Sequence, residues 1–151
     1  MGLFTELGPF LLNSQSLPSA SGNNGTWRPL ANPYSWSSEA SLLVWEQPAG
    51  VGFSRCDVGG CEGFPWDDVT SADANLLTLL AFYNAYNEAA ERPLYLAGES
   101  YAGIYVPLLA VRIITYNRNL RGEKPRRLQL RGVAVGNGCI GYGVAGACGI
   151  D

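Results

Sequence analysis

Residues 94–103 read LYLAGESYAG, and the order of residue types in this stretch decides the fold. An apolar run ends at Gly98, and Ser100 follows two residues later. The small residues Ala102 and Gly103 come next, and a helix-like pattern begins at once. A strand, a sharp turn that carries a serine, and a helix form a nucleophile elbow. Gly98 and Ala102 are small enough for the strand and the helix to pass closely, although alanine replaces the second glycine of the usual G-x-S-x-G pattern.

Ser100 has two interpretations. In the first, the turn lifts its hydroxyl above the sheet edge as a nucleophile, and the N-terminus of the following helix directs backbone N–H groups at developing negative charge. In the second, Gly98 ends a strand and Ser100 caps the helix. The five-residue pattern alone favours the second interpretation, because short motifs often match by chance. The rest of the chain must decide between them.

Apolar runs and helical periodicities alternate along the chain. The predicted strands and helices are, in chain order, a strand at 40–45, a helix from Asp67 or Thr70 to about Ala90, a strand at 94–97, a helix at 101–116 and a strand at 128–135. This alternation predicts an α/β fold with a mostly parallel sheet, flanking helices and right-handed crossovers. No internal repeat or linker interrupts residues 1–151, so we expect one domain.

The charge of the chain argues against nucleic acid as a partner. Its formal net charge is −3, and no basic stripe with interleaved aromatic residues is present. Residues 118–131 are basic but are interrupted by Gly122 and Pro125, so we expect a solvated loop there and no anion site. No apolar run approaches the roughly 18 residues of a membrane span. No signal peptide follows Met1, which indicates either a cytosolic protein or a chain that lacks its true start.

The absence of histidine limits the chemistry of Ser100. A Ser-His-Asp hydrolase needs an imidazole to take the hydroxyl proton near neutral pH, and the 151 residues contain none. Either Ser100 is not catalytic, or the histidine lies on sequence outside this chain. A mixed cysteine–histidine metal site is excluded for the same reason, and we predict neither a metal nor another cofactor.

Two further features depend on the cellular compartment. The chain has four cysteines, Cys56, Cys61, Cys139 and Cys148, with spacings that match no zinc knuckle. A local bridge between Cys56 and Cys61 is sterically allowed, and free buried thiols are the alternative. Asn24-Gly25-Thr26 is a glycosylation acceptor if the protein is secreted and a polar turn if it is not.

Five blocks of the sequence resemble the serine carboxypeptidase family, in the family's order and at compatible spacings. The blocks are GLFTELGPF (2–10), NPYSW (32–36), EQPAGVGFS (46–54), GESYAGIYVP (98–107) and GNG (136–138). The resemblance implies an incomplete α/β-hydrolase fold over residues 1–151. It also implies a peptidase that removes the C-terminal residue of peptides or proteins. Members of this family usually work in the secretory pathway, in vacuoles or lysosomes, or outside the cell.

The same resemblance assigns roles to four residues. Ser100 is the implied nucleophile, and the backbone N–H of Tyr101 is one donor to the oxyanion. Glu6 and Glu99 resemble the acidic pair that recognises the C-terminal carboxylate of the substrate. Carboxylates gathered around that charged end cannot all stay ionised, so at least one must hold a proton and donate a hydrogen bond. We therefore expect binding to be best at acidic pH.

The resemblance also implies that parts of the family site lie outside this sequence. A glycine-rich block that supplies the other oxyanion donor normally precedes GLFTELGPF, and the aspartate and histidine of the triad normally follow GNG. We therefore expect no peptidase activity from these 151 residues alone. Two alternatives remain: an acyltransferase on the same scaffold, and a non-catalytic, degenerate homologue.

Overall fold

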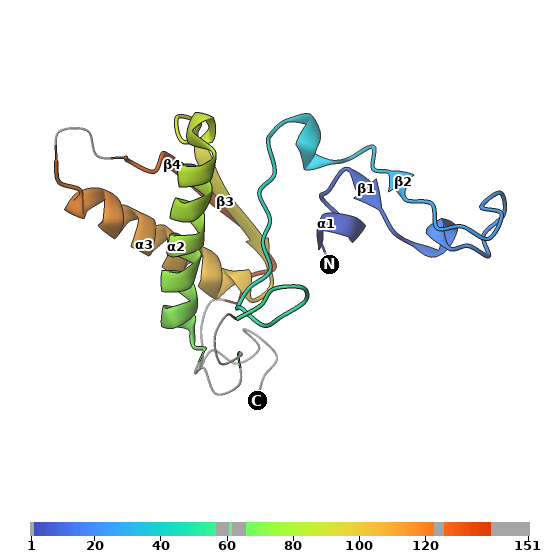
Figure 1. Ribbon diagram of the computed structural model, residues 1–151, viewed down its shortest axis with the longest axis horizontal. Coiled ribbons are helices and arrows are strands. Elements are labelled where there is room, and N and C mark those ends of the chain that lie inside the picture. The colour runs from blue at the N-terminus through green and yellow to red at the C-terminus, as the bar shows by residue number, and fades with distance from the viewer. Residues whose placement is uncertain (1, 57–60, 62–65, 123–125, 140–151) are drawn as a thin grey trace. The chain divides into compact units, whose positions relative to one another are not determined.

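The computed structural model describes residues 2–56, 61, 66–122 and 126–139. These residues fall into two compact units, 1–45 and 46–151, which we treat as an N-terminal and a C-terminal unit (Figure 1). The prediction that residues 1–151 form one domain stays a prediction.

Short elements joined by polar loops make up the N-terminal unit. In chain order they are α1 (Gly2–Thr5), β1 (Phe10–Leu11), the 3-10 helix η1 (Ser14–Ser16), β2 (Leu30–Ala31) and the 3-10 helix η2 (Trp36–Ser38). The strands β1 and β2 pair antiparallel, with Phe10 opposite Ala31. The buried Asn32 side chain joins two of the family-like blocks, because its Nδ2 donates to the carbonyl oxygens of Glu6 (2.7 Å) and Gly8 (2.9 Å).

The prediction of a strand at residues 40–45 is wrong. These residues adopt no regular secondary structure, and the side chains of Leu43 and Val44 are exposed. A strand requires a partner for its backbone N–H and C=O groups, and no strand in the described part of the chain pairs with this segment. Apolar composition alone was therefore a misleading signal here.

The C-terminal unit contains the elements that surround Ser100. They are α2 (Asp68–Ala85), the 3-10 helix η3 (Asn87–Ala89), β3 (Leu94–Glu99), α3 (Ala102–Asn119) and β4 (Leu130–Gly136). The predicted helices and the two later strands are thus confirmed, with shifted ends. The largest shift is in the first helix, which ends at Ala85 and continues as a separate 3-10 turn.

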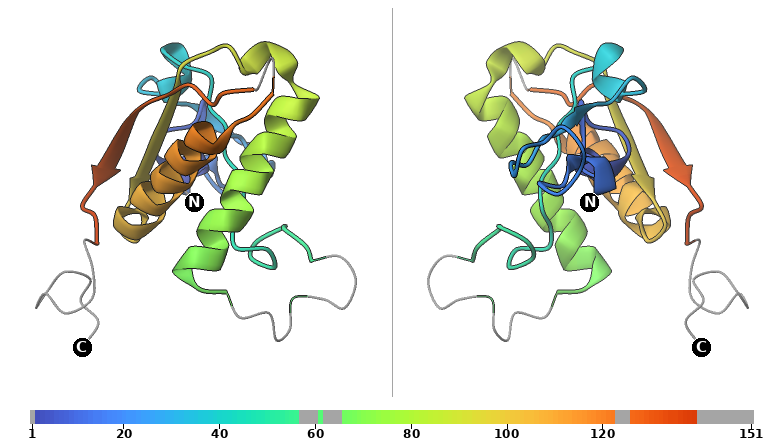
Figure 2. Two further views of the ribbon diagram at one scale, coloured as in Figure 1. Left: turned by 90° about the vertical axis from the view of Figure 1, so that its left-hand side faces the viewer. Right: turned by 90° about the vertical axis from the view of Figure 1, so that its right-hand side faces the viewer.

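The strands β3 and β4 pair in parallel, as the alternating pattern predicted. Leu96 lies opposite Val133, and Glu99 lies opposite Gly136. The helix α3 packs against both strands, and α2 packs against α3 (Figure 2). Leu79 of α2, Ile113 of α3 and Leu128 are almost completely buried. Burial of these large apolar side chains stabilises the core of the unit.

A capping box fixes the start of α2. Asp67 is the N-cap residue, and its carboxylate accepts hydrogen bonds from the backbone N–H of Thr70 (2.7 Å) and from the Thr70 hydroxyl (2.8 Å). The Thr70 oxygen in turn accepts the N–H of Asp67 (2.9 Å). The backbone N–H of Thr70, and then its hydroxyl, lower the pKa of Asp67 below its ordinary value of 3.8.

The basic segment 118–131 is only partly the solvated loop that we expected. Its first residues complete α3, and its last two belong to β4. The guanidinium of Arg126 donates to the carbonyl oxygen of Tyr83 (2.6 Å) and to Oδ1 of Asn84 (2.9 Å), at the C-terminal end of α2. It also donates to the side chain of Asn87. Arg126 therefore joins this segment to α2.

Candidate active site

Ser100 lies in a strained turn between β3 and α3. Its φ angle is 59°, in the left-handed region that serine rarely adopts. The N–H of Ser100 donates to the carbonyl oxygen of Gly136 (3.0 Å), and its own carbonyl oxygen accepts the N–H groups of Gly103 (2.9 Å) and Cys139 (2.8 Å). The bonds to Gly136 and Cys139 hold the turn against the end of β4 and the segment after it, and the bond from Gly103 closes the turn itself. A non-glycine residue keeps such a conformation only when its surroundings enforce it.

Small residues allow the strand, the turn and the helix to approach closely. A Cβ atom on Gly98 would overlap the Cβ of Ala102, and one on Gly103 would overlap the backbone of Cys139. The prediction that the positions flanking Ser100 must be small is therefore confirmed. Gly103 adds a second close contact, between the first turn of α3 and the segment after β4.

The side chain of Ser100 is exposed and does not cap the helix. The N-cap residue of α3 is Tyr101, and no side chain makes a capping hydrogen bond there. Within the described residues, the Ser100 hydroxyl has no hydrogen-bond partner. The interpretation of Ser100 as a capping serine is thus wrong, and the hydroxyl is accessible to a ligand.

Tyr101 sits directly at the N-terminus of α3, which spans 18 residues. The N-terminus is the positive end of the helix dipole, so backbone N–H groups here favour nearby negative charge. The phenolic hydroxyl of Tyr101 donates to Oδ1 of Asp68 (3.0 Å), and its ring packs edge-to-face on Tyr105. Asp68 is a residue that the sequence reasoning missed as part of the elbow, because no local pattern links it to Tyr101.

Glu6 and Glu99 belong to different units. Glu99 is the last residue of β3 and is exposed. Glu6 is exposed in the turn that follows α1, where the side chain of Asn32 holds its carbonyl group. Their joint role in binding a carboxylate stays a prediction.

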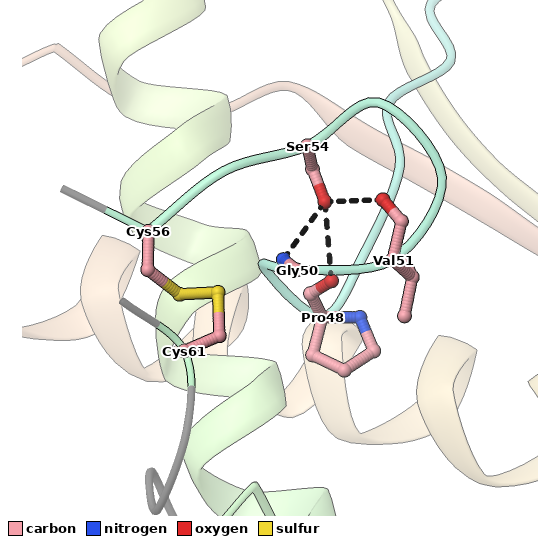
Figure 3. The surroundings of a disulfide bond; sticks show 6 residues. All are labelled: Pro48, Gly50, Val51, Ser54, Cys56 and Cys61. Carbon is pink, nitrogen blue, oxygen red and sulfur yellow. Dashed lines mark hydrogen bonds between the residues drawn. A yellow bond between two sulfur atoms is a disulfide. The ribbon is translucent and has the colours of Figure 1, made fainter. Parts of the chain in front are cut away.

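A compact loop precedes α2 in the same unit as Ser100. The Ser54 hydroxyl accepts the N–H of Gly50 (3.0 Å) and lies 2.5 Å from the carbonyl oxygen of Val51, to which it donates (Figure 3). A disulfide joins Cys56 to Cys61 (Figure 3), which decides between the two interpretations of this cysteine pair. The EQPAGVGFS block therefore forms a loop, which suits its proline and glycines.

The described part of the chain presents neither a metal-binding cluster nor a membrane-spanning helix. No group of three or more histidine, cysteine, aspartate or glutamate side chains among the described residues is placed to hold a metal ion. No helix in the described part of the chain is both long and apolar enough to cross a membrane.

Comparison with known proteins identifies the family of this chain. A family model described as serine carboxypeptidase matches residues 1–144. The chain belongs to the serine carboxypeptidase family. Its relatives include the lysosomal protective protein of Mus musculus, with 37% identity over 93% of this chain and 25% of the relative. Serine carboxypeptidase-like 42 of Arabidopsis thaliana is 37% identical over 90% of this chain and 26% of that protein.

A solved serine carboxypeptidase shows the fold. A prohormone-processing carboxypeptidase from Saccharomyces cerevisiae superposes with a TM-score of 0.72 and 29% sequence identity, over 91% of this chain and 27% of the yeast chain. The present chain thus carries part of the α/β-hydrolase fold of the serine carboxypeptidases. It spans about a quarter of the length of the relatives that it matches.

Proposed function

We propose that the protein carrying this chain is a serine-type carboxypeptidase that releases C-terminal residues from peptides through an acyl-enzyme on Ser100. The observation that carries the proposal is the exposed serine at φ 59°, held between β3 and α3, in a member of this family. A strained strand-to-helix turn is the geometry that exposes a nucleophilic serine in α/β hydrolases.

In the proposed reaction, Oγ of Ser100 attacks the carbonyl carbon of the last peptide bond. The carbonyl oxygen becomes an oxyanion, which the backbone N–H of Tyr101 stabilises at the N-terminus of α3. The C–N bond then breaks, the released amino acid leaves with a proton, and water hydrolyses the acyl-enzyme. The general base is an imidazole from outside these 151 residues, because they contain no histidine.

Glu6 and Glu99 give the proposed enzyme its preference for a free C-terminus. A carboxyl group that holds a proton donates a hydrogen bond to a carboxylate, whereas an ionised carboxyl group repels it. We therefore propose that KM increases as the pH rises from acidic values towards neutrality.

The compartment is part of the same proposal. One relative is named as a lysosomal protein, and the Cys56–Cys61 disulfide is typical of oxidising compartments. We propose that the protein works in the secretory pathway, a vacuole or lysosome, or outside the cell, on the C-termini of peptides or proteins.

The absence of histidine favours one alternative for the isolated chain, a non-catalytic homologue. The deciding experiment uses the full-length protein with a blocked dipeptide substrate and a fluorophosphonate probe. We expect release of the C-terminal amino acid and labelling at Ser100, both abolished by Ser100→Ala. Ser14→Ala, at an exposed serine of η1, is the matched control and should leave both intact. Labelling that survives Ser100→Ala would rule out the assignment.

A further inference from the structure

We propose that Asn24 carries an N-linked glycan in the mature protein. Asparagine followed by any residue except proline and then by serine or threonine is the acceptor sequence for this modification. The pattern occurs once in the 151 residues, at Asn24-Gly25-Thr26. The inference depends on the proposed secretory compartment and goes beyond the proposed peptidase activity.

Buried polar side chains give the loop around Asn24 a defined shape. Ser16 is completely buried and Asn23 is 7% exposed. Nδ2 of Asn23 donates to the carbonyl oxygens of Gln15 (2.9 Å) and Leu17 (2.6 Å), so this side chain points into the loop. The backbone N–H of Arg28 donates to the carbonyl oxygen of Ser16 (3.1 Å) and closes the loop. The next residue, Asn24, is thereby turned towards solvent.

Asn24 is exposed, and there is open space on both sides of it. Its φ angle is 49°, and within the described residues its side chain has no hydrogen-bond partner. Gly22 and Gly25 flank it at φ angles of 85° and 77°. A Cβ atom built on either glycine meets no atom within 4 Å. Within the N-terminal unit, a glycan can therefore be attached to Asn24 without displacing a contact of the described residues.

A purely structural role accounts for part of this arrangement. Asparagine tolerates the left-handed region and suits turns, and the Thr26 hydroxyl donates to the carbonyl oxygen of Asn23 (2.7 Å). The turn does not, however, use the side chain of Asn24. Spontaneous deamidation, the usual fate of an exposed Asn-Gly pair, requires attack by the Gly25 nitrogen. That N–H donates to the carbonyl oxygen of Pro18 (3.2 Å), which opposes the attack.

The surface of the N-terminal unit gives the glycan a physical consequence. Aromatic side chains are exposed at Phe10, Trp27, Tyr34 and Trp36. A large polar sugar at Asn24 adds hydration close in sequence to Trp27, and N-linked glycans solubilise the surfaces that carry them. We therefore expect the form without the glycan to aggregate more readily.

The experiment places the chain behind a cleavable secretion signal in a eukaryotic cell and appends a second acceptor sequence in a C-terminal tag. Only molecules with the tag glycosylated are scored, so every scored molecule has entered the secretory pathway. We expect a second mobility shift that a peptide N-glycosidase removes, leaving Asp at position 24 by mass spectrometry. The fraction of Asp at position 24 that is present before the glycosidase is added reports deamidation. This fraction is subtracted from the final value.

Three variants make the test specific. Asn24→Gln and Thr26→Ala should each abolish the second shift, whereas Thr26→Ser should keep it because serine also completes the acceptor. The proposal is wrong if tag-glycosylated molecules carry no sugar at Asn24. The measurement needs no substrate, so failure of the proposed peptidase activity does not affect its outcome, and absence of the glycan leaves the assignment of Ser100 intact.

Discussion

The phenolic hydroxyl of Tyr101 donates a hydrogen bond of 3.0 Å to Oδ1 of Asp68. Tyr101 directly follows Ser100, and Asp68 is the first residue of α2, 33 positions earlier in the chain. The bond therefore ties the elbow to the N-terminus of a second helix. Because the N–H of Tyr101 is the proposed oxyanion donor, Asp68 restrains the residue that carries this donor.

Removing this hydrogen bond should destabilise the C-terminal unit. Tyr101→Phe deletes only the hydroxyl, and we expect the free energy of unfolding to fall by about 1 kcal/mol, the usual net value for one hydrogen bond. The measurement is urea unfolding of Tyr101→Phe, Asp68→Ala and the double variant. Additive effects of the two single changes would show that the pair does not interact.

Gly98 should not accept even a methyl group. A Cβ atom there overlaps Ala102, so Gly98→Ala must push β3 away from α3, at a cost of about 1–3 kcal/mol for overpacking. Gly136→Ala is the matched control, because it lies in the paired strand and its Cβ would meet only Cγ of Glu99 at 3.8 Å. Equal losses of stability in the two variants would contradict the close approach.

The strain at Ser100 predicts an unusual order of stabilities. Glycine adopts positive φ without steric cost, whereas alanine keeps a penalty of about 1–2 kcal/mol. We therefore expect Ser100→Gly to be more stable than Ser100→Ala by about 1 kcal/mol. Thermal unfolding of the two variants measures the difference. The reverse order would mean that the turn is not held at φ 59°.

Local signals explain why the elbow could be predicted from sequence. Gly98, Ser100 and Ala102 lie within five residues, and their sizes alone require a tight turn between a strand and a helix. The same holds for β3, β4 and α3, because an apolar run or a helical periodicity is also a pattern among residues that are close in sequence. Wherever neighbours in sequence determine the structure, the sequence pattern was sufficient.

Non-local contacts explain what the sequence could not predict. Residues 40–45 are apolar but have no partner strand among the described residues, so composition alone gave the wrong element. The bonds from Tyr101 to Asp68 and from Arg126 to Tyr83 span 33 and 43 positions, and no spacing rule links such pairs. The joint role proposed for Glu6 and Glu99 also depends on residues far apart in the chain, and it stays a prediction.

The capping box of α2 predicts a dependence of stability on acidic pH. Hydrogen bonds from Thr70 lower the pKa of Asp67 in the folded protein. The stabilisation that they provide is therefore present above the ordinary value of 3.8 and is lost as the pH falls through the lower, folded-state pKa. Asp67→Asn keeps an acceptor but does not titrate. In this variant, the free energy of unfolding should depend less steeply on pH as the pH falls from above 3.8 to below it.

A second variant checks the cause of this shift. Thr70→Ala removes the hydroxyl, the smaller contribution, and keeps the backbone N–H, the larger one. It should therefore reduce the pH dependence by less than Asp67→Asn does. An unchanged slope in Asp67→Asn would show that other carboxylates control unfolding in acid.

Arg126 should stabilise the C-terminal end of α2. Its guanidinium donates to Tyr83 and Asn84 at the last turn, where orphan carbonyl groups and the negative end of the helix dipole favour a cation. We expect Arg126→Ala to lower the free energy of unfolding by about 1–2 kcal/mol. Arg127→Ala is the matched control, since Arg127 is exposed and has no hydrogen bond among the described residues. Hydrogen exchange at the end of α2 should accelerate only in Arg126→Ala, and equal acceleration in both variants would show that the guanidinium contacts do not hold the helix end.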